Sequence, residues 1–533
     1  MSKSAFEQRK LYRSFLVVVL LLISLSAGRC FAQSGDKKTT VVRGVVFKDI
    51  NRNGMLDAGE KGIAGVGVSN GIDVVLTDRM GRYKLAIEDE AVIFVIKPAG
   101  WMTMVDALKL PRFYYIYNPL GSPKLCYSGV ESTGKLPDSI NFGLYKRKES
   151  KQFNVIIFGD PQVPDKESLN YLCHDAIEEV AGIDAVFGVT LGDITGEAPL
   201  LLPDINKVMS LIGIDWYNLP GNHDMNYDAD GDEHSLETYK SIYGPTYYAF
   251  NYGLVHFVLL DTIIAKEGKD NRLEYDEGLT DRQLEFVKND LAHVDKDKLV
   301  VVMSHTGLNL LLKNQRELLK ILEKYPHTLS VAGHQHETEN VFLGAEQGWH
   351  GKEPHHIYVS GAVSGAWWSG SPDDEGVPHA MMRNGVPNGY SVISFDKNSY
   401  SIRFKAFRRS PDYQMRAYAP DEIDFDKTDK TEIILNVFAG SERNKIEMKI
   451  DAEGNWETME HIIRKDPYYE MAVEREAKYN FPRVPWSENG EVSGHIWQAT
   501  LPVGLSKGAH LLYFRSTDMF GQSYSCKRVL RVK

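Results

Sequence analysis

Five short polar clusters in the middle of the chain hold residues that can bind metal ions. Each cluster follows directly after a hydrophobic run of strand length. The clusters are Gly159-Asp160-Pro161-Gln162, Gly192-Asp193, Gly221-Asn222-His223-Asp224, Ser304-His305 and Gly333-His334-Gln335-His336. Their side chains offer carboxylate and amide oxygens and imidazole nitrogens, which are common ligands of divalent metal ions. A lone Asp or His at a strand end usually makes a local hydrogen bond, but a series of such clusters indicates a shared metal site.

The hydrophobic runs before these clusters are typical of buried strands, because they are rich in Val, Ile, Leu and aromatic residues. They cover residues 153–158, 185–191, 216–219, 299–303 and 329–332. In open α/β sheets, ligands bind at the carboxyl ends of the strands. We therefore expect the clusters to converge on one crevice.

The order of these motifs resembles the signature of the calcineurin-like metallophosphoesterases, which is D-x-H, G-D, G-N-H-[DE], a strand-end His and G-H-x-H. All of these blocks are present across about half of the chain, with Gln162 in the place where most members have His. Residues 244–248, 360–368, 378–379 and 387–390 are similar to a secreted bacterial subgroup. In that subgroup the catalytic domain lies between two β-rich accessory domains.

The resemblance implies two divalent metal ions that share Asp193 as a bridging ligand. The other ligands of the first ion would be Asp160, Gln162 and His336, and those of the second would be Asn222, His305 and His334. His223 would protonate the leaving group or stabilise the developing charge, and Asp224 would orient its imidazole.

The implied activity is hydrolysis of a phosphomonoester or a phosphodiester by in-line attack of a metal-bridging hydroxide. The motifs do not choose between these two substrates. An amide oxygen from Gln162 in place of an imidazole favours Mn²⁺, Mg²⁺ or iron over Zn²⁺, although the identity of the metal stays open.

The alternative is a binding or scaffolding protein on a degenerate phosphoesterase fold. Such a protein would have lost several ligands, whereas only position 162 departs from the pattern and Gln162 can still coordinate. The sequence therefore favours an enzyme, a metal-dependent phosphoric ester hydrolase.

Length and pattern predict three domains after an N-terminal signal, because 533 residues are too many for one hydrophobic core. Residues 41–147 alternate apolar and polar positions between Gly-rich turns and predict a β-sandwich. Residues 150–409 alternate strand and helix patterns, which predicts a catalytic two-sheet α/β sandwich with helices outside. Residues 411–533 are again β-rich and resemble an immunoglobulin-like domain.

Within the catalytic region, apolar spacing predicts a helix across residues 169–180, and Thr280 with Gln283 predicts a capping box at the start of another. The strand patterns at residues 357–363, 390–395 and 400–407 are expected to complete a second sheet. Trp367 and Trp368 lie near the later motifs and could stack on a substrate or pack in the core.

The first 32 residues have the form of a cleavable secretion signal, with basic residues, an apolar stretch at 15–27 and small residues at the cleavage motif. The apolar stretch is shorter than the roughly 18 residues of a membrane-spanning helix, and Arg29 before Cys30 disfavours lipidation. We predict cleavage after Ala32 and export to the periplasm or the cell exterior, with no transmembrane segment in the mature protein.

The mature chain would be acidic, because removal of 1–32 takes away five basic residues and one acidic residue and moves the net charge from −11 to −15. This charge argues against non-specific nucleic-acid binding. The three remaining cysteines predict no disulfide framework. The expected partner is a phosphate-ester substrate, and the β-rich domains could bind a cell-surface glycan or protein.

Residues 49–60 match a twelve-residue calcium loop. The candidate Ca²⁺ ligands are Asp49, Asn51, Asn53, Asp57 and Glu60. Because the flanking patterns are strands, the loop is unlike an EF-hand and is similar to calcium loops of bacterial surface β-modules. An ordinary Asn-Gly turn is the alternative interpretation.

Overall fold

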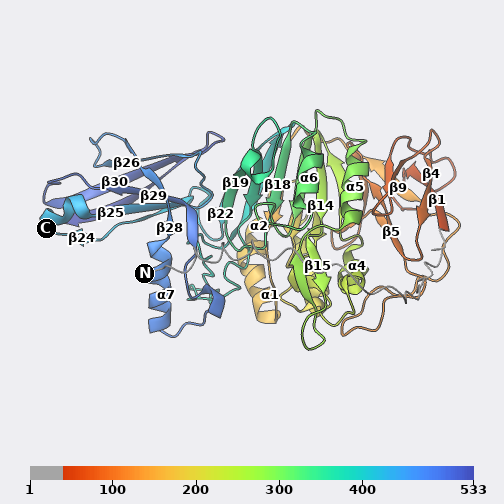
Figure 1. Cartoon of the computed structure of the whole chain (residues 1–533), viewed down its shortest axis with the longest axis horizontal. Coiled ribbons are helices and arrows are strands. Elements are labelled where there is room, and N and C mark those ends of the chain that lie inside the picture. Colours follow the sequence, from red (N-terminus) through yellow and green to blue (C-terminus); the bar gives the residue numbers. More distant parts are fainter. Residues whose placement is uncertain (1–39) are drawn as a thin grey trace, which may run out of the picture. The chain divides into compact units, whose positions relative to one another are not determined.

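A computed structural model of the chain describes residues 40–533 (Figure 1). The signal predicted at residues 1–32 lies outside the described residues and stays a prediction. Among the described residues, no helix combines the length and the apolar character needed to cross a membrane.

Two mixed sheets form the region that the sequence predicts to be catalytic, which is called the catalytic region below. The first has the strand order β12-β11-β10-β21-β22, in which β10, β11 and β12 run parallel. Its strands are β10 (Gln152–Phe158), β11 (Phe187–Leu191), β12 (Asp215–Leu219), β21 (Gly389–Asp396) and β22 (Ser399–Ala406). The second has the order β13-β14-β17-β18-β20-β19, with antiparallel strands only at its two edges. Its strands are β13 (Tyr248–Tyr252), β14 (Val255–Leu260), β17 (Leu299–Ser304), β18 (Thr328–Ala332), β20 (His355–Val359) and β19 (Glu339–Leu343).

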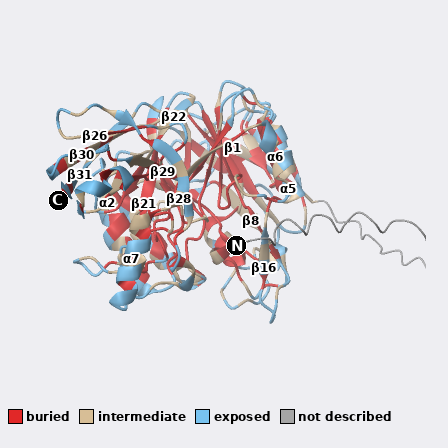
Figure 2. Ribbon diagram, turned by 60° about the vertical axis from the view of Figure 1, so that its left-hand side comes forward, coloured by how far each residue is buried: buried red, intermediate tan, exposed pale blue. Residues whose placement is uncertain are grey.

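Alternation along the strands divides the core into two layers. Val155 and Ile157 of β10 belong to the cluster shared with the second sheet, whereas Ile156 and Phe158 pack with the helices on the outer face. Since both faces are covered, β11, β14 and β17 are buried along their whole length. Figure 2 shows this concentration of buried residues in the strands, with exposed residues on the outer sides of the helices.

The helices of this region are α1 (Lys166–Leu172), a π-helical turn (Cys173–Ile177), α2 (Glu178–Val180), α3 (Leu202–Met209), α4 (Glu237–Tyr243), α5 (Asp281–Leu291) and α6 (Gln315–Leu322). Two of these helical segments, residues 166–180 and α5, are those predicted from the sequence; α3, α4 and α6 were not predicted. The π turn joins α1 to α2 into the predicted helix. The α5 capping box is half formed, because Thr280 accepts a hydrogen bond from the backbone N–H of Gln283, while the Gln283 side chain accepts one from the backbone of Asp261.

The expectation that the strands after the last His motif would together complete a second sheet was wrong. Of the three predicted strands, β20 joins the second sheet, whereas β21 and β22 extend the first. The reason is that β21 pairs antiparallel with the otherwise free edge of β10, with Ile157 opposite Ser391. A strand pattern does not reveal which sheet has a free edge.

Two smaller sheets precede the catalytic region. One has the order β4-β1-β9-β6-β7 and the other β3-β2-β5-β8. Their strands are β1 (Thr40–Lys48), β2 (Gly67–Ser69), β3 (Val74–Leu76), β4 (Arg82–Ile87), β5 (Ala91–Ile96), β6 (Trp101–Val105), β7 (Pro111–Arg112), β8 (Tyr114–Tyr117) and β9 (Phe142–Lys146). In β4 exposed and buried residues alternate strictly, as the sequence predicts for a half-covered strand.

Two further sheets follow the catalytic region, with the orders β23-β25-β29-β28 and β24-β31-β30-β26-β27. Their strands are β23 (Met415–Tyr418), β24 (Glu422–Ile423), β25 (Glu432–Val437), β26 (Lys445–Ile450), β27 (Glu457–Thr458), β28 (Glu460–Lys465), β29 (Val492–Thr500), β30 (Gly508–Thr517) and β31 (Ser523–Val532). One helix, α7 (Pro467–Lys478), lies between β28 and β29 in the chain. The predicted class, an α/β two-sheet core with β-rich flanking regions, is confirmed, while the domain boundaries stay predictions.

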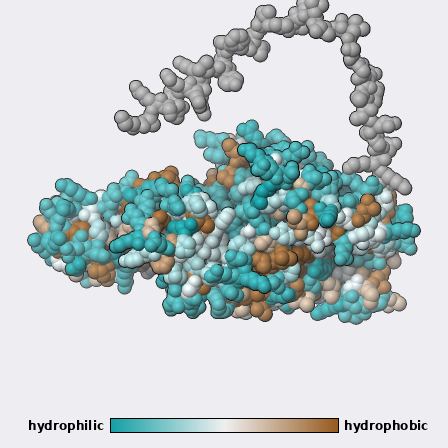
Figure 3. Space-filling model, turned by 90° about the horizontal axis from the view of Figure 1, so that it is seen from below, coloured by the Kyte–Doolittle hydropathy of each residue, from teal (hydrophilic) through white to brown (hydrophobic). Residues whose placement is uncertain are grey.

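The face in Figure 3 is mainly hydrophilic, with hydrophobic residues in small scattered groups. Groups of this size are ordinary on a folded protein surface.

Candidate metal centre

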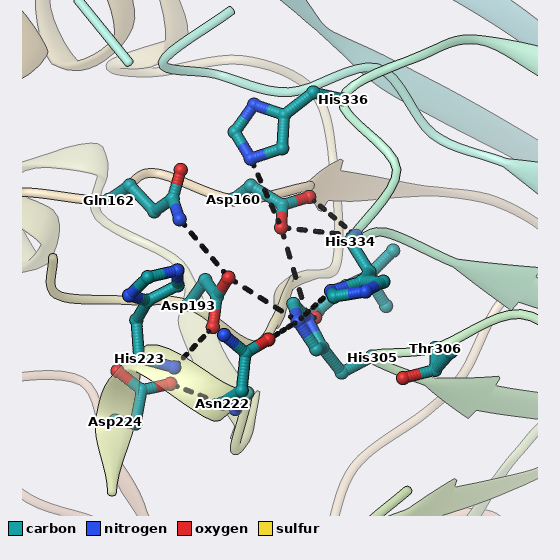
Figure 4. Close-up of polar contacts among 12 residues, drawn as sticks. Asp160, Gln162, Asp193, Asn222, His223, Asp224, His305, Thr306, His334 and His336 are labelled. Carbon is teal, nitrogen blue, oxygen red and sulfur yellow. Dashed lines mark hydrogen bonds and ion pairs between the residues drawn. The ribbon is translucent and has the colours of Figure 1, made fainter. Parts of the chain in front are cut away.

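The predicted clusters meet at the carboxyl ends of β10, β11, β12, β17 and β18, which belong to both sheets of the catalytic region (Figure 4). The candidate ligands brought together are Asp160, Gln162, Asp193, Asn222, His305, His334 and His336. Parallel strands end at the same edge of a sheet, so runs that are distant in sequence place their end residues side by side.

Asp193 lies in the middle of this group. Its Oδ2 accepts a hydrogen bond from Gln162 Nε2 at 3.2 Å and lies 3.3 Å from His305 Nε2. Its Oδ1 accepts a hydrogen bond from the backbone N–H of His223 at 2.9 Å. The ligand atoms of Asp193, His305 and His334 all lie within 4.8 Å of one another. This spacing suits side chains that share an ion.

Backbone carbonyls fix the orientation of two of the imidazoles. His305 Nδ1 donates to the carbonyl of Leu191 at 2.8 Å, and His336 Nδ1 donates to the carbonyl of Gly365. Because a carbonyl only accepts, Nδ1 carries the hydrogen and Nε2 is the atom left for a metal ion. His305 Nε2 lies 3.1 Å from Asn222 Oδ1, and His336 Nε2 lies 3.8 Å from Asp160 Oδ1.

Burial and neighbouring charges have opposing effects on the pKa values of the candidate ligands. Burial raises the pKa of Asp160 to about 7 and lowers that of His336 to about 4. Burial also disfavours charge on His305, but the Asp193 carboxylate outweighs it and raises the pKa of His305 to about 10. Burial acts against the Asp193 carboxylate as well, yet the His305 charge holds its pKa below the usual range. The carboxylates that attract a proton here also attract a cation.

One unpaired oxygen supports the fit of a metal ion to these residues. Gln162 Oε1 is buried and has no hydrogen-bond partner among the described residues. Leaving a buried amide oxygen unpaired is unfavourable, and coordination of a cation would satisfy it. The donor set of carboxylates, amides and imidazoles therefore fits divalent metal ions.

The backbone of the candidate ligands is unusual. Asp160, Gln162, Asp193, His334 and His336 have φ values of 45°, 40°, 48°, 69° and 51°. Such left-handed conformations are uncommon outside glycine and concentrate at functional sites, where the surrounding structure holds them. The strain is therefore located where the metal chemistry is expected.

Two glycines allow the loops to approach each other closely. A Cβ atom at Gly221 would lie 2.2 Å from Asp193 Oδ1, and one at Gly333 would lie 2.7 Å from Asp160 Oδ2. Both distances are shorter than real Cβ contacts. The Gly residues of the G-N-H-D and G-H-Q-H motifs thus leave room for the two carboxylates.

His223 lies beside the candidate ligands and contacts the carboxylate of Glu197, a residue outside the sequence motifs. Its Nδ1 is 3.5 Å from Glu197 Oε1, and Glu197 also pairs with Arg272. Burial disfavours the charged imidazole, but the Glu197 carboxylate outweighs burial and raises the pKa of His223. In turn, the imidazole lowers the pKa of Glu197 to about 2.

The predicted contact between Asp224 and the His223 imidazole is not formed. The Asp224 carboxylate accepts hydrogen bonds from the backbone N–H groups of Ile194, Thr195 and Gly221, at 3.2, 3.0 and 2.9 Å. Burial raises the pKa of Asp224 to about 6. Asp224 therefore ties the loop after β11 to the turn after β12, and Glu197 takes the place beside the imidazole.

Other residues beside the candidate metal centre lie outside the sequence motifs. His334 Nε2 lies 3.1 Å from Glu277, at the end of β16 (Glu274–Glu277), which pairs with β15 (Ile263–Lys266). The two adjacent tryptophans have different roles. Trp368 is buried and donates from Nε1 to the carbonyl of Pro161 at 2.9 Å, whereas the ring of Trp367 stands 5.1 Å from that of His223.

The predicted calcium loop is closed by its own side chains. The Asn51 and Asn53 amides donate to Asp57 Oδ2 at 2.8 and 2.9 Å. Asp49 accepts from the backbone of Gly54, and Glu60 accepts from the backbone of Asp57. These bonds also suit an ordinary turn, so calcium binding stays a prediction.

Comparison with known protein families agrees with this geometry. The calcineurin-like phosphoesterase model matches residues 153–338, and the models of the N-terminal and C-terminal regions of such phosphoesterases match residues 50–126 and 357–524. The chain belongs to the calcineurin-like phosphoesterase family, and the resemblance seen in the motifs is confirmed.

Two solved structures show a distant similarity to the chain. One is the purple acid phosphatase PPD1 from yellow lupin (Lupinus luteus) seeds, with 13% identity, a TM-score of 0.35 and coverage of 69% of this chain and 66% of that chain. The other is PhoD, with 9% identity, a TM-score of 0.33 and coverage of 93% of this chain and 86% of that chain. No curated protein matches the sequence significantly.

Proposed function

We propose that this chain is an exported phosphoesterase that uses two divalent metal ions to hydrolyse phosphomonoesters or phosphodiesters. The main support is the meeting of the candidate ligands at the strand ends, where backbone carbonyls hold His305 and His336 with Nε2 toward the carboxylates. Export rests on the sequence of residues 1–32.

In this proposal Asp193 serves both ions. Asp160, Gln162 and His336 complete the ligands of the first ion, and Asn222, His305 and His334 complete those of the second. Mn²⁺, Mg²⁺, iron and Zn²⁺ are the candidates, and the Gln162 oxygen favours the first three. Two such ions, when bound, supply a nucleophile from water at neutral pH and neutralise the phosphoryl oxygens.

The remaining step, protonation of the leaving oxygen, falls to His223. Glu197 lies against Nδ1 of its imidazole, which leaves Nε2 as the atom that delivers the proton. Glu197 also favours the protonated imidazole, as its effect on the pKa of His223 indicates. Asp224 acts indirectly, because it holds the backbone on both sides of Asp193 and Asn222 in place.

The direct experiment measures hydrolysis by the purified mature protein after chelation, with each metal added back separately. p-Nitrophenyl phosphate and bis-p-nitrophenyl phosphate distinguish monoester from diester activity. We expect turnover only after a metal is restored. Turnover that persists after complete chelation, or its absence with every metal, would contradict the proposal. Export is tested separately by N-terminal sequencing, which should find Gln33 as the first residue of the mature protein.

A further inference from the structure

Two tryptophans from distant segments border the candidate metal centre. The ring of Trp367 stands nearly perpendicular to that of His223, with 5.1 Å between centroids and an angle of 89°. The ring of Trp486, from the 3₁₀ turn Pro485–Ser487, lies 5.7 Å from Trp367 and 5.5 Å from His336. We call Trp367 and Trp486 the aromatic wall.

Packing alone does not explain the conformation of Trp367. The residue is 38% exposed, although large aromatic side chains gain most from burial. Its φ is 54° and that of the buried Trp368 is 53°, so both tryptophans hold a backbone conformation that is strained for bulky residues. Strain of this kind persists at ligand sites, because the fold holds a side chain where a ligand needs it.

Trp486 offers a second sign of a ligand. Its indole Nε1 is shielded from solvent and has no acceptor in the part of the chain that the structure describes. Arg383 lies 6.0 Å from the ring centroid and forms an ion pair with Glu491, so the ring is supported from one side. A buried N–H without an acceptor is costly, and an acceptor on a bound molecule would remove this cost.

The position of the wall relative to His223 indicates which part of a substrate it meets. If His223 protonates the leaving oxygen, the group attached to that oxygen extends past the imidazole. Trp367 is the aromatic residue that contacts this imidazole.

We propose that the aromatic wall binds the leaving group of the substrate, and that the enzyme prefers phosphate esters of alcohols that carry a flat aromatic ring. This inference rests on the proposed function, because it takes His223 as the proton donor. Trp367 would stack on the ring, and Trp486 would hold Trp367 in position and donate from Nε1 to an acceptor on the bound molecule. The two residues would then determine specificity without taking part in the bond cleavage.

The test compares kcat/KM for benzyl phosphate with that for ethyl phosphate, and for the corresponding methyl diesters. Benzyl alcohol and ethanol are alcohols of similar acidity, so the ratio reports binding of the ring rather than intrinsic reactivity of the leaving group. The wild type should prefer the benzyl esters. Trp367→Ala and Trp367→Leu should lower the ratio at least about fivefold, whereas Trp367→Phe should retain most of it.

Matched controls separate this effect from a general loss of structure. Phe481→Ala removes an aromatic side chain that is also 38% exposed and precedes Trp486 in the same segment, and it should leave the ratio unchanged. Trp486→Ala should lower the ratio while ethyl phosphate is still hydrolysed. A wild type without benzyl preference, or a ratio unchanged in the Trp367→Leu and Trp486→Ala proteins, would overturn the inference. Absence of all turnover in the wild type would instead contradict the proposed function.

Discussion

Replacement of Gly221 by Ala tests whether the close contact between two loops determines metal binding. The new Cβ would lie 2.2 Å from Asp193 Oδ1 and 2.4 Å from the Asp193 backbone nitrogen. Ordinary contacts begin at 3.4 Å, and a backbone nitrogen cannot rotate away, so the loop after β11 or the Asn222 turn must move by about 1 Å. Displacements of this size cost roughly 10²-fold in turnover. We expect that loss in kcat, together with a lower metal content.

Substitutions at two further glycines test whether the loss of activity depends on how close the new Cβ lies to its neighbours. Gly333→Ala places a Cβ 2.7 Å from the Asp160 carboxylate, which can rotate, so its loss should be smaller. Gly231→Ala meets no atom within 4 Å at an extended backbone and should be neutral. The assay combines elemental analysis of metal content, kcat on the preferred ester and thermal melting. Full metal content and full kcat in Gly221→Ala would refute the reasoning, as would an equal loss in Gly231→Ala.

His223→Ala should keep both metals and lose roughly 10²–10⁴ in turnover, and an empty metal centre would show that His223 is a ligand. Glu197→Gln should shift the high-pH limb of the kcat profile to lower pH. The Glu197 carboxylate raises the pKa of His223, so without it the proton donor loses its proton at a lower pH. An unchanged limb would show that Glu197 does not act on His223. Gln162→His should raise activity with Zn²⁺ relative to Mn²⁺ after reconstitution, and an unchanged ratio would mean that Gln162 is not a ligand. In the parent, Ca²⁺ at 100 times its Kd should stabilise the fold by about 2.7 kcal/mol and raise the melting temperature. The double variant Asp49→Ala/Glu60→Ala should lose this Ca²⁺ dependence. The same dependence in both proteins would identify an ordinary turn.

The strand ends and the candidate ligands were predictable because both depend on local sequence. An apolar run such as 299–303 forms a strand that is buried on both faces, and the polar residue that follows, His305, must then emerge at its carboxyl end. Parallel strands end at the same edge of a sheet, so predicting each strand end separately also predicts that the candidate ligands lie close together.

The partners of the proposed catalytic residues depend on contacts that no local pattern encodes. Glu197 reaches His223 because the loop after β11 folds back beside the turn after β12, and a lone Glu in a loop gives no sign of this. Trp486 comes from the C-terminal region and meets His336 only in the folded chain. The prediction for Asp224 was wrong for a similar reason, because backbone N–H groups of a neighbouring loop satisfy its carboxylate.

The most direct test of the account is the metal stoichiometry of the wild type and of Asp193→Asn, measured together with ester hydrolysis after chelation and reconstitution. Asp193 lies between the two sets of candidate ligands, so loss of its charge should weaken the binding of both ions. The account predicts two ions per chain and restored hydrolysis in the wild type, with a reduced metal content and no measurable turnover in the variant. Two ions and full turnover in Asp193→Asn would contradict it.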